Sequence, residues 1–353
     1  MDYIKYWVPV LAVVVGYLGM IAGGVWVWSG FATLPLLAVM DSIASHDLSV
    51  RNMKDGIGAL LPLWLSALGP VGLYIVFAYH VSLGDGPLVV LGAMLTLAWL
   101  NTAPLLPACH ELFHRRGAFS RTLGRYCQVG YFDPMRDIAH VVGHHIDVAT
   151  YEDGDTSRRG ETLYFFALDA MFKSVQHSIR MECQANEAAG RSRWSIGNRL
   201  YRSVAALILF HLVIYFIGGV FASGVALCAQ LIARFLVEAF NYFQHYGVVR
   251  ISGKPIQRRH LWNHHKWFSR VYTFEITNHA EHHLDSYKEY YKLVPDEGSI
   301  RMPSIFICFF LGLVPPLWEK YIIRPSLQKW DDEYASEDER AVGENDNKLA
   351  GWL

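Results

Sequence analysis

Nine of the sixteen histidines in this chain fall into four short clusters. Imidazole is a common side-chain ligand for transition metals, and it is largely neutral near pH 7 without a large pKa shift. Residues three or four apart share one face of a helix, so three of the clusters should each direct two rings at one point. Nine rings exceed the needs of one ion and suit two metals, with four or five ligands each. The candidate metal ligands are His110, His114, His140, His144, His145, His245, His279, His282 and His283.

The first cluster, H-E-L-F-H, also matches the H-E-x-x-H motif of zinc proteases, in which Glu111 would be the general base. That site would use two histidines and one further ligand and would leave most of the clustered histidines without a role, which disfavours it. His264 and His265 form a weaker fifth cluster. We favour a role in which they hydrogen-bond to and orient another histidine ring over direct binding of a metal. The isolated histidines are interpreted as structural side chains: His46, His80, His177, His211 and His260.

The surrounding sequence is typical of a membrane protein, with 52% hydrophobic and 18% charged residues. A helix needs ~20 apolar residues to cross the hydrocarbon core. Length alone favours a re-entrant segment for residues 31–43. If this segment crosses the membrane, however, nearly all Lys and Arg residues lie on one side. Basic residues concentrate in this way in cytoplasmic loops. We therefore predict six spans, with both termini and all four histidine clusters cytoplasmic. The predicted spans are residues 8–28, 31–43, 57–83, 86–109, 200–217 and 220–243.

The rest of the chain is expected to complete a single domain over residues 1–353, because histidines from both halves are needed for one site. Residues 303–317 are apolar but contain Pro315-Pro316, which indicates an interfacial or buried segment. The acidic tail, about 326–353, has eight acidic residues and one Arg between positions 331 and 346, so we expect it to be solvated and partly mobile. The first apolar stretch is too long for a cleaved signal peptide and lacks a suitable cleavage site.

No sequence motif for a second redox cofactor is apparent. The five cysteines form no C-x-x-C pair, which argues against an iron–sulfur centre in this chain. No G-x-G-x-x-G follows a predicted strand, so no nucleotide-cofactor fold is indicated. If the histidine-bound metals do redox chemistry, the electrons must arrive from another protein.

The last predicted span carries a polar stripe at helical spacing, formed by Arg234, Glu238, Asn241 and His245. Ionisable residues inside a span usually face a cavity or a partner, which favours a functional position for His245. The alternative is that Arg234 and Glu238 only neutralise each other.

The order of the motifs H-E-L-x-H, H-x-x-x-H-H, N-Y-x-x-H-Y-G and H-x-x-H-H, together with the span spacing, resembles the membrane-bound diiron alkane and xylene monooxygenase family over nearly the whole chain. D-I-A-H and N-Y-F-Q-H-Y-G are closer to the xylene branch. Alkane hydroxylases typically have glutamate where this chain has Ala139 and Gln244, so any role of those carboxylates does not transfer.

The resemblance implies an all-α, polytopic membrane protein with a non-haem diiron site that uses O2 to hydroxylate a C–H bond. Electrons would come from NADH through a separate flavin and [2Fe–2S] reductase, with a rubredoxin as the alternative partner. An alkyl-arene methyl group of the toluene, xylene or p-cymene type is the expected substrate, and a medium-chain alkane is the alternative. Candidate docking residues for the partner are Arg115, Arg116, Arg121, Arg158, Arg159, Arg258 and Arg259.

We assign roles to other side chains near the histidine clusters from their positions in the sequence. Glu111 and Glu281 are the candidate catalytic residues. Candidates for orienting the histidine rings are Asp137, Asp147, Asp155, Glu238, Asn241, Gln244, Asn278 and His264. Candidates for the substrate pocket are Trp99, Asn101, Leu105, Leu106, Phe240 and Phe243.

Two other function classes stay open. One is a membrane fatty-acid desaturase or lipid hydroxylase, because such enzymes have a similar arrangement of histidines. A metal transporter or sensor would also use clustered histidines, but a transporter should place its ligands near the bilayer midplane.

Overall fold

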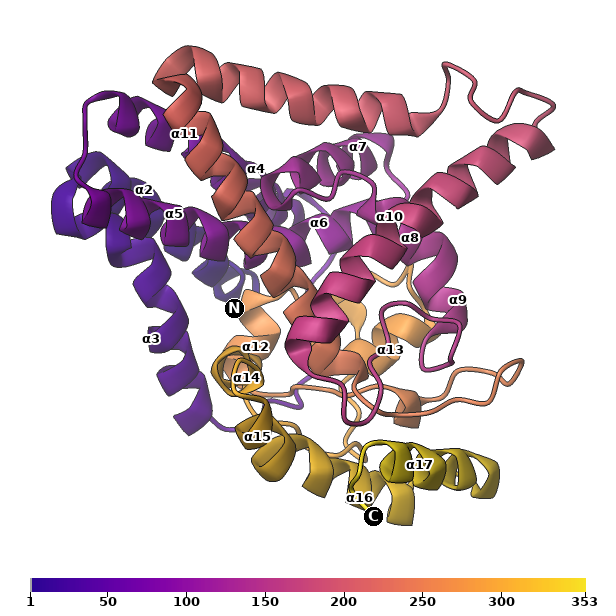
Figure 1. Ribbon diagram of the computed structural model, residues 1–353. Helices are drawn as coiled ribbons and strands as arrows, with labels where there is room; N and C mark the ends of the chain where they lie inside the picture. Colours follow the sequence, from indigo (N-terminus) through magenta and orange to yellow (C-terminus); the bar gives the residue numbers. More distant parts are fainter. Residues whose placement is uncertain (1) are drawn as a thin grey trace.

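The computed structural model describes residues 2–353, and within this range the secondary structure is helical with no strand (Figure 1). Five helices are long and apolar enough to cross a membrane, and they cover Asp2–Ala22, Gly24–Ile43, Ile57–Ser82, Pro87–His114 and Arg199–His245. The protein is therefore an all-α membrane protein, as predicted. The α-helices are α1 (Asp2–Lys5), α2 (Val8–Ala22), α3 (Ser29–Ile43), α4 (Ile57–Ser82), α5 (Pro87–Thr102), α6 (Leu105–His114), α7 (Ala118–Cys127), α8 (Arg136–Ala139), α9 (His145–Asp147), α10 (Leu163–Ala188), α11 (Arg199–His245), α12 (Trp267–Tyr272), α13 (His279–Leu284), α14 (Ile305–Gly312), α15 (Pro315–Trp318), α16 (Arg324–Glu333) and α17 (Glu337–Leu349).

The longest helix, α11, has two arms that meet at Gly219, whose φ of 75° is outside the helical range. Glycine adopts this conformation without the steric cost that a Cβ would impose. The first arm lies across one end of the molecule, and the second arm runs back into its centre (Figure 1). The five apolar helices, one of them with two arms, thus provide the six apolar segments that the sequence predicted.

The first two apolar segments meet earlier in the chain than predicted. Helix α2 ends at Ala22, and the chain turns at Gly23 and Gly24, which have φ angles of 69° and 56°. The second apolar segment therefore begins at Gly24 with a short 3₁₀ helix, Gly24–Trp28, that leads into α3. Its 20 residues are enough to span the hydrocarbon core, whereas residues 31–43 alone are not.

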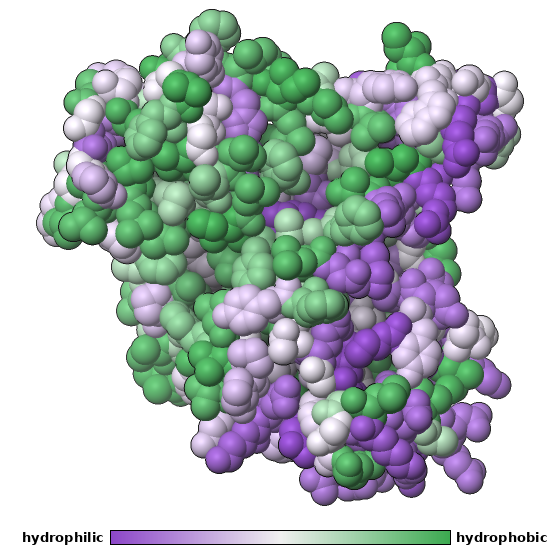
Figure 2. Space-filling model, in the orientation of Figure 1, coloured by the Kyte–Doolittle hydropathy of each residue, from purple (hydrophilic) through white to green (hydrophobic). Residues whose placement is uncertain are grey.

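The apolar and polar parts of the chain separate clearly on the surface. In the view of Figure 2, the hydrophobic surface covers mainly the upper left, and hydrophilic residues gather at the right and bottom. Helix α10 and the small helices α8, α9 and α13 lie on the polar side of the apolar bundle (Figure 1). The predicted span at residues 86–109 continues to His114 with an interruption between α5 and α6.

The segment with the two adjacent prolines has one buried and one exposed side. In α14, Ile305, Phe306 and Phe309 are buried, whereas Leu313 and Leu317 are about 40% exposed. This agrees with the prediction of an interfacial or buried segment.

The acidic tail is helical and only partly solvated, because five of its eight acidic residues are exposed and the others are not. The tail forms α16 and α17, and Glu339 is only 2% exposed. Glu339 accepts bonds from Arg259 Nε at 2.9 Å and His260 Nε2 at 2.8 Å, and Asp331 pairs with Arg159 at 2.7 Å. Two of the negative charges, on Asp331 and Glu339, are matched by basic side chains from distant parts of the chain, a pairing that the local sequence does not reveal.

Candidate metal centre

All nine predicted histidines converge in one region, where they form two separate groups. The ligand nitrogens within each group lie within 4.8 Å of one another, and no carboxylate belongs to either group. The rings come from α6, the π-helix His140–His144, α9, the end of α11 and α13. We call the first the five-histidine group (His110, His114, His140, His145 and His282) and the second the four-histidine group (His144, His245, His279 and His283).

The grouping corrects one part of the spacing argument. His110 and His114 share a group as predicted, but His140 and His144 do not; His140 instead joins His145. The reason is local: His140–His144 is a π-helix, in which the hydrogen-bond repeat is five residues instead of four. Residues five apart therefore lie on one face, and His144 is turned towards the other group.

The rings face one another with nitrogens at contact distance. Nε2 of His140 lies 2.8 Å from Nε2 of His110 and 3.0 Å from Nε2 of His145. In the other group, Nε2 of His245 and Nε2 of His279 are 2.6 Å apart. Among residues 2–353, neither ring nitrogen of His114 or of His283 has a hydrogen-bond partner. Buried lone pairs that face one another, with few protons to share, fit a bound cation.

The protonation state supports the same conclusion. Burial, reinforced by the neighbouring histidines, lowers the pKa of His140, His279 and His283 well below the ordinary value. Burial lowers the pKa of His282 to about 3. These rings are therefore neutral at physiological pH, which is the form that binds metals.

Three rings of the four-histidine group are oriented by acceptors behind them. Nδ1 of His144 donates to Asp153 at 2.9 Å, and Nδ1 of His245 donates to the carbonyl of its own helix residue Asn241 at 2.9 Å. Nδ1 of His279 donates to the carbonyl of Ile276 at 3.1 Å. Because these oxygens only accept, the proton stays on Nδ1 and Nε2 keeps its lone pair for a metal.

Asp153 was not among the predicted site residues. Its carboxylate raises the pKa of His144, although burial alone would lower it. No spacing rule connects the two residues, because the turn that brings Asp153 back to His144 depends on contacts such as the bond from Thr156 Oγ1 to Asp153 at 2.6 Å.

The two predicted catalytic carboxylates face cations instead of the ring nitrogens. Glu111 accepts from Arg115 Nε at 3.1 Å and from the backbone of Tyr290 at 3.4 Å. Glu281 accepts from Arg258 and Lys288, each at 2.5 Å. Both lie beside metal-ligand candidates in the sequence, but the structure uses them in ion pairs at the polar rim.

Of the other predicted orienting residues, Glu238 and Asn241 are directly connected to the site. Glu238 is fully buried and accepts from Arg136 at 2.9 Å, from Asn241 at 2.8 Å and from Arg234. Arg234 and Glu238 are therefore paired, as the alternative interpretation held, but the pair also fixes Asn241, whose carbonyl holds His245.

The remaining orienting candidates do not hydrogen-bond to the nine rings. Gln244 donates to the carbonyl of Ile276 at 3.3 Å, Asn278 donates to Glu275 at 2.7 Å, and Asp137 pairs with Arg125 at 2.9 Å. Nδ1 of His264 donates to the carbonyl of Pro303 at 2.8 Å. Asp147 and Asp155 line a cleft beside His144.

Three of the six predicted pocket residues belong to a buried aromatic cluster between α5, α11, α12 and α14. Trp99 stacks on Tyr272 at 6.5 Å between ring centroids and meets Phe309 edge-on at 5.6 Å. Phe243 and Phe240 contact Phe309 at 5.3 Å and 6.4 Å. Leu105 and Leu106 are buried at the start of α6.

Asn101 has a different environment from the other pocket candidates. Its side chain donates to the carbonyls of Pro70 at 3.2 Å and Leu97 at 2.9 Å. The bond to Pro70 ties α5 to α4.

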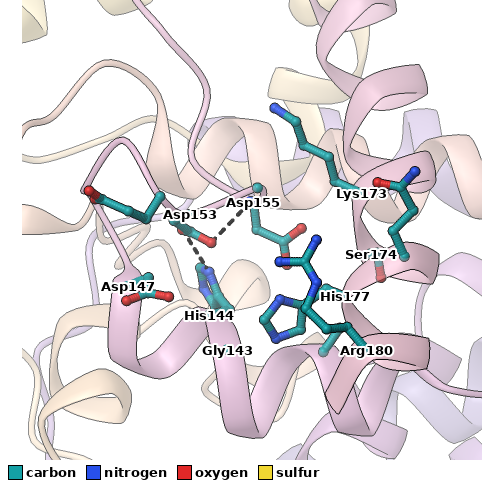
Figure 3. A pocket seen from close by; sticks show the side chains of 13 residues that line it. Gly143, His144, Asp147, Asp153, Asp155, Lys173, Ser174, His177 and Arg180 are labelled. Carbon is teal, nitrogen blue, oxygen red and sulfur yellow. Dashed lines mark hydrogen bonds and ion pairs between the residues drawn. The ribbon is translucent and has the colours of Figure 1, made fainter. Parts of the chain in front are cut away.

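Two polar clefts reach the histidines from solvent. The His144 cleft, about 290 Å³, is lined by Asp147, Glu152, Asp153, Asp155, Lys173, Arg180 and their neighbours (Figure 3). The His114 cleft, about 640 Å³, is lined by Asp55, Glu111, His114, Arg115, Arg116, Asp285, Tyr287, Lys288, Glu289, Lys292 and their neighbours. Each group of histidines thus has one ligand at the end of its own cleft.

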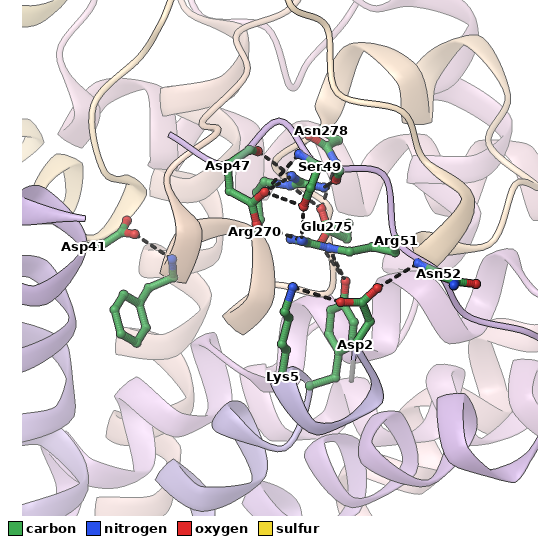
Figure 4. Close-up of polar contacts among 12 residues, drawn as sticks. Asp2, Lys5, Asp41, Asp47, Ser49, Arg51, Asn52, Arg270, Glu275 and Asn278 are labelled. Carbon is green, nitrogen blue, oxygen red and sulfur yellow. Dashed lines mark hydrogen bonds and ion pairs between the residues drawn. The ribbon is translucent and has the colours of Figure 1, made fainter. Parts of the chain in front are cut away.

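A buried ion network supports α13, and nothing in the sequence pattern indicated it (Figure 4). Glu275 accepts from Arg51 Nε at 2.8 Å and from Arg270 Nε at 2.6 Å. Asp47 pairs with Arg51 at 2.7 Å and with Arg270 at 3.3 Å. Asn278, which immediately precedes His279, is held by Glu275, so the network connects the chain after α3 to the last histidine cluster.

Several of the predicted docking arginines are used internally. The side chain of Arg159 is fully buried against Asp331, and Arg259 pairs with Glu339. Arg258 pairs with Glu281 at the polar rim. Arg116 and Arg121 remain exposed, and among residues 2–353 neither has an ion-pair partner.

Comparison with known proteins places this site in a family. The family model described as "fatty acid desaturase" matches residues 85–295. The hydroxylase component of xylene/toluene monooxygenase from Pseudomonas putida is 40% identical over 100% of this chain and 96% of its own length. The chain belongs to this family of membrane-bound monooxygenases.

Other monooxygenases are similar to this chain at lower identity. Alkane 1-monooxygenase 1 of Pseudomonas aeruginosa is 27% identical over 83% of this chain and 76% of its own length. Alkane 1-monooxygenase 2 of Alcanivorax borkumensis is 25% identical over 93% of this chain and 91% of its own length. The protein is therefore a membrane monooxygenase, an oxidoreductase whose two histidine groups bind metal. Like other monooxygenases with separate components, it receives electrons from a partner and acts on an apolar substrate.

Proposed function

We propose that this monooxygenase holds two iron ions and hydroxylates the methyl group of an alkyl-arene to a benzylic alcohol. The balanced reaction is R–CH3 + O2 + 2 e⁻ + 2 H⁺ → R–CH2OH + H2O. The observation that carries the proposal is the division of nine imidazoles, eight of them buried, into a group of five and a group of four. Membership in the monooxygenase family supports O2 as the cosubstrate and iron as the metal.

The donor set fits two iron ions. Imidazole suits iron as well as zinc, copper and nickel, so the choice of iron rests on the family and not on the ligands alone. We assign the five-histidine group to one ion and the four-histidine group to the other. When bound, the two ions supply O2 activation and the oxidising power for C–H cleavage.

The protein's own residues prepare the site for this chemistry. Asp153 and the carbonyls of Asn241 and Ile276 fix the tautomers of three rings, so their Nε2 lone pairs are directed inward. Eight of the nine candidate ligands are buried, which limits the access of bulk water to the reacting centre. The two polar clefts are the approaches through which the two protons of the reaction can enter.

An alkyl-arene is the substrate class best supported. The relative that is 40% identical over the whole chain is named for xylene and toluene. Ala139 and Gln244 occupy positions where the alkane branch carries glutamate. In this structure Ala139 borders the His144 cleft, and Gln244 instead donates to the carbonyl of Ile276 that also orients His279. The aromatic cluster around Trp99 and Phe309 offers edge and face contacts for an arene.

We further propose that the protein lies in a bacterial inner membrane with both termini and the metal site in the cytoplasm. The one-sided distribution of Lys and Arg supports this topology. The proposed electron donor is an NADH-dependent reductase with flavin and [2Fe–2S] centres, which matches the absence of a redox-cofactor motif in the sequence.

A competition assay tests the substrate class. The purified protein in nanodiscs, supplied with reductase, NADH and O2, receives equal amounts of p-xylene and n-octane, and both alcohols are quantified. We expect 4-methylbenzyl alcohol to dominate. A clear preference for octane would assign the protein to alkane hydroxylation, and an alkene product from a long acyl chain would assign it to desaturation.

A further inference from the structure

Eight of the nine histidines are buried and His145 is only partly exposed, so an electron donor must reach most of the rings through the surrounding protein. Among residues 2–353, two aromatic side chains other than histidine contact the nine histidine rings. Phe113 contacts His110, His114 and His140 but is buried. Tyr287 is 56% exposed and meets the ring of His114 edge-on, with 6.3 Å between centroids.

Tyr287 therefore links the surface to a metal-ligand candidate. It lies four residues after His283, on the chain that leaves α13, and it lines the His114 cleft. An aromatic ring in contact with a ligand ring provides a short route through π systems from the surface to the five-histidine group.

The lining of the His114 cleft contains four acids and four bases, so its charges balance, and the exposed bases Lys54 and Arg121 next to it add positive charge. Arg115 pairs with both Asp55 at 2.9 Å and Glu111 at 3.1 Å, so this group of three has one more acid than bases. Lys292 pairs with Glu289 at 2.8 Å, and Lys288 pairs with Glu281 at 2.5 Å. In the described part of the chain, three exposed bases at or next to the lining have no ion pair, and one acid, Asp285, has none. The three bases are Lys54, Arg116 and Arg121.

The His144 cleft differs from the His114 cleft in its charge and in its aromatic content. Its lining contains four carboxylates, Asp147, Glu152, Asp153 and Asp155, against two bases (Figure 3). It contains no aromatic side chain other than histidine. The two clefts are therefore not equivalent as surfaces for a partner.

We propose that the His114 cleft is the electron entry surface, where a one-electron carrier protein with an acidic face docks over Tyr287. This inference rests on the proposed function, because it requires a redox metal at the five-histidine group. Two carriers, or one carrier twice, are each oxidised by one electron, and the two electrons reduce O2 together with two protons in the balanced reaction given above. Electron-transfer complexes are typically small and transient, which a cleft of this size accommodates.

The test measures anaerobic reduction of the iron-loaded, full-length protein in nanodiscs by stopped flow. The protein donor is an NADH-reduced flavin and [2Fe–2S] reductase, and the small donor is dithionite. Tyr287→Leu removes the ring, Tyr287→Phe keeps it, and Tyr321→Leu is the matched change at another tyrosine that is 59% exposed. The paired variant Arg116→Glu, Arg121→Glu reverses the unpaired charges, and Lys173→Glu is the matched reversal in the His144 cleft.

We expect Tyr287→Leu to slow reduction by the protein donor severalfold, with Tyr287→Phe and Tyr321→Leu close to wild type. The paired charge reversal should lower the association rate by about tenfold, and added salt should remove the difference. Iron content and the alcohol yield after dithionite reduction and O2 addition should be unchanged in every variant.

Unchanged reduction of Tyr287→Leu by the reductase would refute the inference, as would slower reduction of Lys173→Glu. Loss of iron or of the dithionite-supported yield in Tyr287→Leu would assign the ring a structural role and would also refute it. Failure of the wild-type protein to form alcohol after dithionite reduction would instead refute the proposed function on which the inference depends.

Discussion

Replacing Glu275 with glutamine should strongly destabilise the polar half of the protein. Glu275 is fully buried and receives four hydrogen bonds: from Tyr6 at 2.6 Å, Arg51 at 2.8 Å, Arg270 at 2.6 Å and Asn278 at 2.7 Å. The network contains two cations, Arg51 and Arg270, and two anions, Glu275 and Asp47 (Figure 4). Glutamine has nearly the same shape but no charge, so the variant leaves one buried positive charge without a partner.

The expected cost follows from this charge balance. Removing one partner of a buried ion pair typically costs about 3–5 kcal/mol, because the remaining ion stays buried and unpaired. Both guanidinium groups have 0% side-chain exposure, so solvent cannot screen the excess charge. Since Glu275 also holds Asn278 beside His279, we expect weaker metal retention in the four-histidine group as well.

The assay is chemical unfolding of the protein in nanodiscs, followed by tryptophan fluorescence, with iron measured on the same samples. The matched control is the double variant Glu275→Met with Arg51→Met, which removes one charge of each sign and leaves Arg270 paired with Asp47. Replacing a whole buried pair by apolar residues is often close to neutral, so the double variant should be more stable than Glu275→Gln. A loss below about 1 kcal/mol in Glu275→Gln, or a double variant less stable than the single one, would refute the reasoning.

Three further predictions follow from the site and the topology. Asp153→Asn should lower metal affinity about 10–100-fold by removing the carboxylate behind His144, measured by metal titration with Glu152→Gln as the control in the same cleft; equal affinities would argue against the role of Asp153. Reporter tags at residues 1 and 353 should both be cytoplasmic and a tag in the 84–86 turn should lie on the far side, so termini on opposite sides would contradict the six-span topology. The purified chain should form no alcohol with NADH and O2 alone, and turnover without a reductase would contradict the two-component scheme.

The sequence was most informative about the metal ligands, because histidine spacing and the apolar segments are local patterns. The nine histidines converge, and the six apolar segments exist as predicted. The exact grouping of the rings was not predictable, because the spacing argument assumed an α-helix where His140–His144 is a π-helix. That deviation exchanges the group of His144 with that of His145.

Long-range ion pairs account for the main errors. Most acids of the charge-rich tail are exposed as expected, but Glu339 is buried against Arg259 and His260, about eighty positions away. The same limit hid Asp153 and the network around Glu275, whose partner Arg51 is 224 positions distant. Composition and local spacing carry no information about which distant opposite charges meet.

Metal analysis combined with turnover tests the central claim most directly. We expect two iron ions per wild-type chain, and about one after His114→Ala in the five-histidine group or His245→Ala in the four-histidine group, with O2-dependent alcohol formation lost in both. Alanine at any of the other seven clustered histidines should also reduce iron and abolish activity, whereas His46→Ala and His177→Ala should leave the iron content largely intact. A single ion per wild-type chain, or full turnover with two or more of the nine histidines removed, would contradict the account.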